Sequence, residues 1–199
     1  MNIYLLRHGE TSWNREQRLQ GITDVPLNSF GVRQSQRLTR WFRKTNVAAV
    51  ITSPLRRARL TADILCRATH PPVLIDSRLR EIDHGPWTGS KISRIQRRLP
   101  VEFATWRFSP DRLRLPAGET LEAVYRRSSA ALSELIAANI SGDVLIVSHG
   151  VTNALLVCAA LGVPLSEICR FSQGNGCLTT LKVNRRQITA VESGIDVAA

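Results

Sequence analysis

Two short apolar runs, far apart in the chain, each end in a histidine followed by a glycine. Ile3–Leu6 leads into Arg7, His8 and Gly9, and Val144–Val147 leads into Ser148, His149 and Gly150. Apolar runs of this length are typical of strands that are buried on both faces of a parallel sheet. Open α/β sheets bind ligands at the carboxyl ends of their strands. The pattern therefore predicts a crevice that holds polar groups from both strand ends, with Gly9 allowing a sharp turn of the backbone.

The residues at the end of the first strand suit an anionic ligand. The planar guanidinium of Arg7 can bind two oxygens of a phosphate at once. His8 can act as a base, a metal ligand or a nucleophile. A surface pair of Arg and His in a loop is the alternative for these residues alone.

A third segment adds more positive charge to the same region. Ala48–Thr52 reads as another buried strand, and Ser53 and Pro54 follow it as a helix cap and a first helical residue. Arg56 and Arg57 then fall in the first helical turn, where the helix dipole is already positive. A bound anion would offset this charge, whereas a solvated basic face is the alternative. Taken together, three strand ends predict a cationic, imidazole-rich pocket for a phosphate ester.

These segments resemble the signature motifs of the histidine phosphatase superfamily, also called the phosphoglycerate mutase-like family. The resemblance covers Asn2 to about Val191. The segments that carry it, in chain order, are Arg7-His8-Gly9-Glu10-Thr11 with Asn14, Ser53-Pro54-Leu55-Arg56-Arg57-Ala58-Arg59-Leu60-Thr61-Ala62, Glu81-Ile82-Asp83-His84-Gly85-Pro86-Trp87-Thr88-Gly89, and Ser148-His149-Gly150. Their order along the chain makes a chance match improbable for the set.

The resemblance implies a role for each matched residue. His8 would attack phosphorus and form a phosphohistidine, which divides one difficult displacement into two easier ones. The groups expected to hold the phosphate are Arg7, Asn14, Arg57, His149 and Gly150. Glu81 would protonate the leaving oxygen and then activate water, with Asp83 and His84 as rivals for that role. His84 departs from the aromatic residue that the family often has at this position. Glu119, in Gly118-Glu119-Thr120, is a further binding candidate.

The alternation of strands and helices predicts a three-layer α/β/α sandwich with a mostly parallel central sheet. We expect one domain over residues 1–199, with a small helical lid at about 84–120. The expected strands are Ile3–Leu6, Val50–Thr52, Val73–Ile75 and Val144–Ser148, followed by a hairpin of Leu178–Val183 and Gln187–Val191. The expected helices are Gly31–Lys44, Leu55–Arg67, Leu121–Ala138 and Thr152–Leu161.

The net charge of +11 is the unusual feature of the composition. A basic stripe at helical spacing contributes to it, formed by Arg33, Arg37, Arg40 and Lys44, while Leu38, Trp41 and Phe42 would face the core from the same helix. Such a surface raises the alternative of a nucleic-acid-binding protein. No motif for base recognition accompanies it, so nucleic acid is not an expected partner. A non-catalytic scaffold is a further alternative, which the set of five catalytic candidates argues against.

Neither a metal nor a cofactor is expected, because the sequence has no metal-ligand spacing and no glycine-rich phosphate loop followed by lysine. The four cysteines, Cys66, Cys158, Cys169 and Cys177, are scattered and read as reduced thiols. The apolar run at the start is too short for a signal peptide, and no stretch reaches the length of a membrane span. We therefore expect a cytoplasmic protein without a membrane partner. A homodimer through an edge strand remains open.

The expected activity is metal-independent hydrolysis of small phosphorylated metabolites. A cofactor-dependent phosphoglycerate mutase is the main alternative, because it would use the same residues. A mutase must shield its phosphohistidine from water, and such members of the family usually have a longer lid and tail. The modest lid and the short segment after the last strand, Ser193–Ala199, favour hydrolysis. An α-ribazole phosphatase of cobalamin synthesis is a further alternative.

Overall fold

A computed structural model describes residues 1–67, 69–138 and 140–196. The strands are β1 (Asn2–Arg7), β2 (Val47–Thr52), β3 (Val73–Ile75), β4 (Asp143–Ser148), β5 (Cys177–Asn184) and β6 (Gln187–Asp196). The α-helices are α1 (Ser12–Arg15), α2 (Ser29–Phe42), α3 (Arg56–Cys66), α4 (Ile92–Arg98), α5 (Pro100–Phe108), α6 (Leu121–Ala137) and α7 (Gly150–Leu161). The short 3₁₀ segments are η1 (Ser77–Leu79), η2 (Gly85–Trp87), η3 (Pro110–Arg112) and η4 (Leu165–Phe171).

The six strands form one sheet in the order β3-β2-β4-β1-β5-β6. The first four of these strands run parallel, whereas β5 runs antiparallel to β1 and carries β6 as an edge hairpin. This topology confirms the predicted mostly parallel sheet with a terminal hairpin. The crossovers between parallel strands place helices on both faces, as such connections require.

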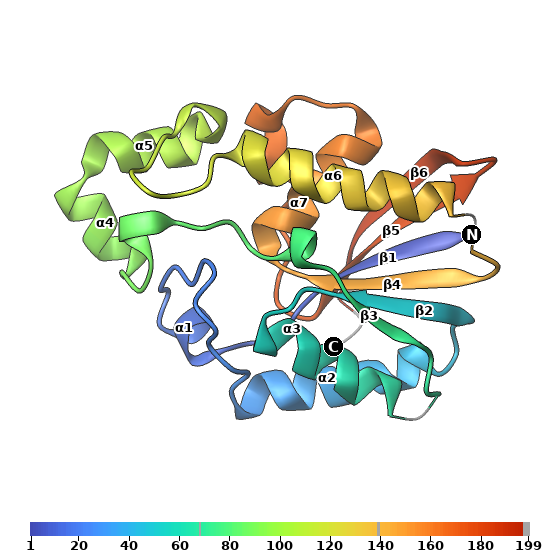
Figure 1. Cartoon of the computed structure of the whole chain (residues 1–199). Coiled ribbons are helices and arrows are strands. Elements are labelled where there is room, and N and C mark those ends of the chain that lie inside the picture. The colour runs from blue at the N-terminus through green and yellow to red at the C-terminus, as the bar shows by residue number, and fades with distance from the viewer. Residues whose placement is uncertain (68, 139, 197–199) are drawn as a thin grey trace.

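Two apolar cores lie on opposite faces of the sheet, so the architecture has three layers (Figure 1). On one face, α6 and α7 pack through Leu132 and Leu156 against strand residues such as Ile146. On the other face, α2 and α3 pack through Leu38 and Leu65. The strands are apolar on both sides because each side is covered, which explains the continuous apolar runs of the sequence.

The boundaries of several elements differ from the predicted ones by one to five residues, the largest difference being the end of β6 at Asp196 rather than Val191, and one predicted cap is wrong. Helix α3 begins at Arg56 rather than at Pro54, with Leu55 as its cap residue, and no side chain of that residue caps it. The carboxylate of Asp24 instead accepts a hydrogen bond from the backbone N–H of Arg56 at 2.6 Å. The Ser53 hydroxyl accepts from the backbone N–H of Leu55 at 3.3 Å and lies in the site described below.

Two glycines bring the loop after β1 against the start of α2. A Cβ atom on Gly31 would lie 2.1 Å from the backbone oxygen of Glu10, and one on Gly9 would lie 2.5 Å from the backbone oxygen of Gly31. The φ angle of Gly9 lies outside the left-handed region. Close backbone approach, rather than the sharp turn that the sequence suggested, is therefore the reason for glycine at position 9.

The chain between β3 and α6 leaves the three-layer body. It contains η1, η2, α4, α5 and η3, and in Figure 1 the helices α4 and α5 lie well away from the sheet, beside the end where β1 and β4 stop. Its apolar residues form a small core of their own, in which Trp87 and Ile95 are buried. No single helix in the described ranges is both long and apolar enough to cross a membrane; only α7 and η4, a pair bent by 114°, reach that criterion together.

Candidate active site

Strands β1 and β4 bring the two histidines together. The strands pair in parallel with Arg7 opposite Ser148, so the next residue of each strand is a histidine at the same sheet edge. The rings of His8 and His149 lie edge to face, with centroids 5.2 Å apart. Both side chains are buried. The sheet thus places two imidazoles side by side from positions 141 residues apart in the sequence.

The hydrogen bonds of His8 fix which ring nitrogen can react. Its Nδ1 lies 2.7 Å from the backbone oxygen of Gly9, which can only accept, so Nδ1 carries the proton. Its Nε2 accepts a hydrogen bond from Nε of Arg57 at 3.3 Å. A lone pair on Nε2 is what a nucleophilic imidazole needs. The structure therefore presents His8 as a neutral ring whose unprotonated nitrogen faces a guanidinium.

Arg57 is buried, Arg7 is partly buried, and both donate to backbone oxygens. Arg57 binds the carbonyls of Gly21 and Thr23 through its two Nη atoms, and Arg7 binds the carbonyl of Gln173 through Nη1. Neither arginine has a carboxylate within ion-pair distance in the described part of the chain. Burial lowers the pKa of Arg7, and it lowers the pKa of Arg57 to about 10. Buried charge of this kind is costly unless an anion compensates it.

The same surroundings keep both imidazoles neutral. Burial lowers the pKa of His8 well below its usual value, and the nearby guanidiniums of Arg57 and Arg7 lower it further. Burial also lowers the pKa of His149, with additional contributions from Arg57, His8 and Arg7. Near neutral pH both rings are therefore uncharged, so the positive charge of the site comes from the arginines.

Ser53 orients the second histidine. Its hydroxyl lies 2.7 Å from Nε2 of His149. The Nδ1 atom of His149 is buried and has no hydrogen-bond partner among the described residues, and the same holds for Nε of Arg7. Buried polar atoms without partners are rare in folded proteins. Their occurrence together at the ends of β1 and β4 points to an anion as the missing partner.

The orientation of the Asn14 amide follows from its neighbours. Its Oδ1 accepts hydrogen bonds from the backbone N–H of Thr11 and from the amide of Asn175. The Asn175 amide also donates to the backbone oxygen of His8. With Oδ1 taken up by donors, the Nδ2 group of Asn14 is the part that is available to a ligand. No sequence motif marks Asn175, which follows a glycine in the segment before β5 and reaches the site only through the fold.

The carboxylate of Glu81 lies at the N-terminus of α7. It accepts from the backbone N–H groups of Val151 and Thr152 and from the hydroxyl of Thr152, all at 3.3 Å. Backbone N–H groups and the helix dipole favour a negative group at this place. Because α7 directly follows His149, the same turn of chain brings Glu81 to the cavity that His8 lines.

A cavity of about 460 Å³ lies over these groups, which is within the range for small-molecule sites. Its polar end is lined by Arg7, His8, Asn14, Arg57, Glu81 and Gly150, together with Gln17, Gln20 and Asn175. Its other end is lined by Ile92, Trp106, Arg107 and Pro110 of the segment between β3 and α6, and by Leu121, Ala154 and Ile168. The cavity therefore joins cationic groups at the edge of the sheet to largely apolar groups from α4, α5, α6, α7 and η4.

Three of the predicted site residues, His149, Glu119 and Asp83, do not line the cavity. His149 is adjacent to the cavity but fully buried behind its lining. Glu119 does not line the cavity, because its carboxylate binds Arg127 and Arg80. Of the two rivals of Glu81, His84 lines the cavity, whereas the Asp83 carboxylate accepts from the backbone N–H of Gly85. The structure thus brings Glu81 and His84 to the cavity and leaves Asp83 outside it.

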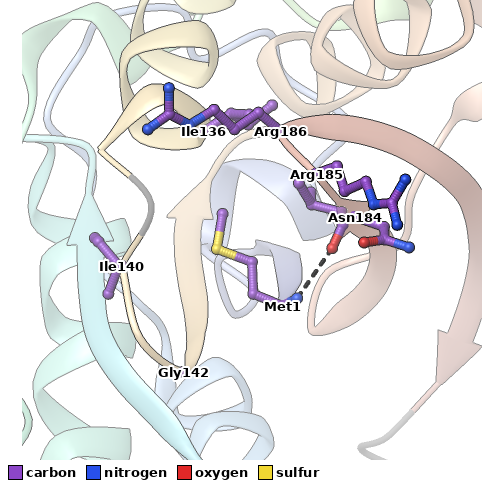
Figure 2. A pocket seen from close by; sticks show the side chains of 8 residues that line it. Met1, Ile136, Ile140, Gly142, Asn184, Arg185 and Arg186 are labelled. Carbon is purple, nitrogen blue, oxygen red and sulfur yellow. Dashed lines mark hydrogen bonds between the residues drawn. The ribbon is translucent and has the colours of Figure 1, made fainter.

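A second hollow, of about 260 Å³, lies at the opposite end of the sheet (Figure 2). Met1, Ile136 and Ile140 form its apolar wall, and Arg185 and Arg186 of the hairpin turn form its rim. The amino group of Met1 donates to the backbone oxygen of Val183 there. Among the described residues, no histidine, cysteine or carboxylate lines this hollow, and it lies at the end of the sheet away from His8.

No group of three or more His, Cys, Asp or Glu side chains within the described ranges could hold a metal ion. The four cysteines carry reduced thiols, of which those of Cys66 and Cys158 are buried. The positive charge that a phosphate ester would require is instead supplied by guanidinium groups.

A parallel sheet whose strand ends surround a neutral imidazole with the guanidinium groups of two arginines defines a class of phosphoryl-transfer enzymes. Comparison with known proteins identifies the family. The family model of the histidine phosphatase superfamily, branch 1, matches residues 3–196, and the chain belongs to this superfamily. Its members are phosphatases or mutases, so the protein is an enzyme that acts on phosphoric monoesters.

Three relatives illustrate the likeness. Phosphoserine phosphatase 1 of Hydrogenobacter thermophilus is 31% identical over 187 residues, which cover 94% of this chain and 89% of the relative. A probable phosphoglycerate mutase, GpmB, of Klebsiella pneumoniae is 37% identical over 169 residues, which cover 82% of this chain and 76% of the relative. The solved structure of Bacillus stearothermophilus YhfR has a TM-score of 0.93 and 32% identity, and the match covers 100% of this chain and 99% of that one.

Proposed function

We propose that the protein is a metal-independent phosphomonoesterase that hydrolyses small phosphorylated metabolites through a phosphohistidine at His8. The observation that carries the proposal is the state of the His8 ring. Its Nδ1 proton is held by the backbone oxygen of Gly9, and its free Nε2 lies 3.3 Å from Nε of a buried arginine, Arg57. A phosphate bound by that guanidinium would lie within reach of the lone pair that attacks it.

The first step is an in-line displacement at phosphorus. Nε2 of His8 forms a bond to phosphorus as the bond between phosphorus and the ester oxygen breaks. Arg7 and Arg57 hold the non-bridging oxygens, and the amide of Asn14, the backbone N–H of Gly150 and Nδ1 of His149 are further donors. Phosphoryl transfer depends mainly on positioning and on such charge stabilisation.

Glu81 is the proposed acid and base. In its protonated form it gives a proton to the departing ester oxygen, which leaves as an alcohol. The resulting carboxylate then takes a proton from water as the water attacks the phosphohistidine, so that phosphate leaves and both His8 and Glu81 return to their starting states. His84 also lines the cavity, but burial lowers its pKa and so disfavours the protonated form that an acid needs.

The cavity supports a small substrate with one phosphate. Its polar end matches a phosphate group, and its apolar end, with Trp106 and Ile168, has room for a compact organic group. We propose that residues 84–120 act as a lid, since side chains of α4 and α5 line this end. The likeness to a probable phosphoglycerate mutase makes a mutase the second candidate, and α-ribazole phosphate remains among the substrates to test.

Product analysis on a panel of phosphorylated metabolites tests the reaction type. The panel includes phosphoserine, α-ribazole phosphate, and 3-phosphoglycerate with and without its bisphosphate. Release of inorganic phosphate is the expected result. Isomerised phosphoglycerate without phosphate release would replace hydrolysis by the mutase reaction.

The nucleophile is tested by substitution and by trapping. His8→Ala should reduce kcat by at least about 10³-fold with the fold retained, because the covalent route is then closed. Acid-sensitive, base-stable phosphate on the quenched wild-type protein should disappear in this variant. His70→Asn is the matched control, since His70 is exposed and outside the cavity. Near-normal turnover by His8→Ala would remove His8 as the nucleophile.

A further inference from the structure

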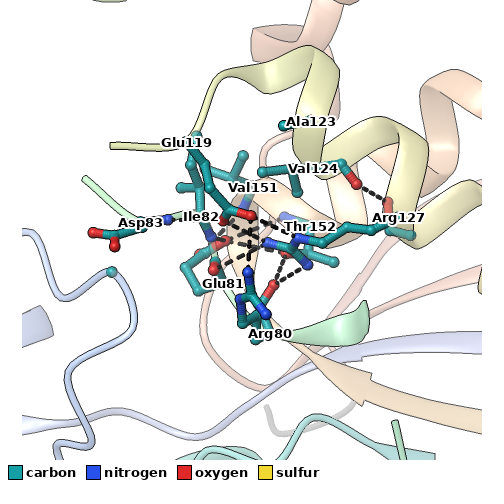
Figure 3. Close-up of polar contacts among 12 residues, drawn as sticks. Arg80, Glu81, Ile82, Asp83, Glu119, Ala123, Val124, Arg127, Val151 and Thr152 are labelled. Atoms are coloured by element: carbon teal, nitrogen blue, oxygen red, sulfur yellow. Dashed lines mark hydrogen bonds and ion pairs between the residues drawn. The ribbon is translucent and has the colours of Figure 1, made fainter. Parts of the chain in front are cut away.

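We infer that Arg127 and Glu119 form a clamp that positions Glu81 for proton transfer, although neither residue lines the substrate cavity. The inference rests on the proposed role of Glu81 and adds two positioning residues to it. Arg127 lies on α6, and Glu119 lies just before that helix (Figure 3). Helix α6 is itself anchored to the sheet through the core that contains Leu132.

The guanidinium of Arg127 uses all five of its N–H donors. Nη1 donates to the backbone oxygens of Arg78 and Arg80, and Nη2 donates to the backbone oxygen of Glu81. Nε and the second Nη2 proton bind the two carboxylate oxygens of Glu119, each at 3.0 Å. A guanidinium has five donors in a fixed plane, so this single side chain holds three carbonyls in one geometry.

Glu119 completes the clamp on the other side of Glu81. Its Oε2 accepts from the backbone N–H of Asp83 at 3.1 Å, and its Oε1 accepts from Arg80 at 3.2 Å. The backbone N–H of Glu119 in turn donates to the backbone oxygen of Asp83. The chain immediately before and after Glu81 is therefore tied to the start of α6.

This segment lies outside regular structure. Residues 80–84 belong to no helix or strand, so their backbone groups have no ladder partners. The Glu81 carboxylate accepts from the backbone N–H of Ile82, within the same segment, at 3.0 Å. Its bonds from Val151 and Thr152 of α7 are 3.3 Å long, which is beyond the usual range for N–H···O contacts. The clamp therefore fixes the backbone that carries the carboxylate, while α7 holds the carboxylate through long contacts.

The burial and charge of the clamp agree with a positioning role. Arg127 is 13% exposed and Glu119 is 18% exposed at the side chain. The hydrogen bonds and charge of Arg127 help to lower the pKa of Glu119, so the carboxylate stays ionised near neutral pH. Neither Arg127 nor Glu119 carries an acidic proton near the reacting atoms, and the Glu119 carboxylate is occupied by its hydrogen-bond partners.

The test separates proton donation from phosphate binding. Single-turnover rates of leaving-group release report the attack of His8 alone, measured with 4-nitrophenyl phosphate and with the best alkyl phosphate of the panel. An aryl leaving group needs little protonation, whereas an alkyl one needs a proton from Glu81. Arg127→Met should lower the alkyl rate by about 10- to 100-fold, the scale of loss for a displaced catalytic group, and the aryl rate by far less.

Matched variants complete the design. Glu119→Gln should show the same selective loss, because an amide places an N–H group against either the donors of Arg127 or the N–H of Asp83. Arg126→Met removes the same charge from the next, exposed position of α6 and should leave both rates unchanged. Arg127→Lys keeps the charge but not the five donors. It replaces Arg127→Met in the rate measurements if circular dichroism shows that Arg127→Met does not fold.

The Glu81→Gln variant distinguishes failure of the clamp from failure of Glu81 as the proposed acid. If Glu81→Gln is selective for the alkyl substrate and Arg127→Met adds nothing to it in the double variant, the clamp acts through Glu81. Equal losses of Arg127→Met on both substrates, or no loss, would overturn the clamp. If Glu81→Gln itself lowers both rates equally, the proposed acid is wrong, whatever the Arg127 variants do.

Discussion

The guanidinium of Arg57 donates to Nε2 of His8 across 3.3 Å while both side chains are buried. A cation at this distance favours the unprotonated ring, because a protonated imidazole would face a like charge. The same cation lies where a phosphate would need it. One contact therefore serves two purposes, since it keeps His8 neutral and supplies charge for the substrate.

The first prediction concerns this pair. Arg57→Met should lower kcat/KM by about 10²- to 10³-fold, as expected when a donor to a charged transition state is removed. It should also raise the pKa of His8, because one of the causes that lower it is gone. The acid limb of the pH profile of kcat/KM should then move to higher pH. An unmoved limb between pH 4 and 7 would show that burial alone keeps His8 neutral.

The second prediction concerns stability and pH. The pKa values of His8, His84 and His149 are all lowered by burial. Below about pH 6.5 the unfolded chain therefore binds up to three protons that the folded chain does not. The free energy of unfolding should fall with decreasing pH by up to about 4 kcal/mol per unit, in the window below 6.5 and above the folded pKa values.

Urea midpoints at pH 7.5, 6.0 and 5.0 measure this loss. His84→Gln should reduce the slope by about one third, because one of three protons is removed from the balance. His70→Asn should leave the slope unchanged, since His70 is exposed. A flat stability between pH 7.5 and 5.0 would mean that the three rings accept protons without unfolding.

The third prediction tests the backbone contact between the loop after β1 and α2. Gly31→Ala would place a Cβ atom 2.1 Å from the backbone oxygen of Glu10, so one of the two backbones must move. We expect a loss of about 2 to 3 kcal/mol in the free energy of unfolding and lower turnover, because the displaced loop carries His8. Gly162→Ala is the comparison: its Cβ would meet nothing within 4 Å, and only the left-handed φ of 65° is strained.

The fourth prediction concerns metal. Because the charge of the proposed transition state is met by Arg7 and Arg57, prolonged treatment with EDTA should leave kcat and KM unchanged. The assay uses a metal-free buffer and an alkyl phosphate substrate. A loss of activity that added Mg²⁺, Mn²⁺ or Zn²⁺ restores would contradict the metal-free mechanism.

The sheet could be predicted from the sequence because its strands are apolar on both sides and end abruptly. Arg7 and His149 lie at strand ends, where a break in the apolar run marks them. Contacts between side chains and the backbone were harder to predict from the sequence than the strands were. The cap of α3 comes from Asp24, in a loop more than thirty residues earlier, rather than from the adjacent Ser53. Local propensity cannot reveal a partner that only tertiary structure supplies.

The candidate site shows the same division. The residues that carry reactive chemistry fall within motifs, so His8 could be predicted from its place at a strand end, whereas Arg57 and Glu81 were predicted through the resemblance to the family. Asn175 and Gln20 could not, because an amide in a loop has no pattern of its own. Glu119 is a binding candidate from its motif, yet it does not line the cavity, and its carboxylate faces Arg127. Sequence proximity to a motif does not give the direction of a side chain.

The pairing of β1 with β4 has a consequence for how the protein acquires activity. His8 and His149 become neighbours only when Arg7 stands opposite Ser148, a contact between the beginning and the last third of the chain. Parallel pairing over such a separation forms slowly. A shift of one residue would also point each side chain to the other face. The recovery of enzymatic activity during refolding therefore reports when the central sheet closes. An intermediate whose helices have formed but whose β1–β4 register is missing would be inactive.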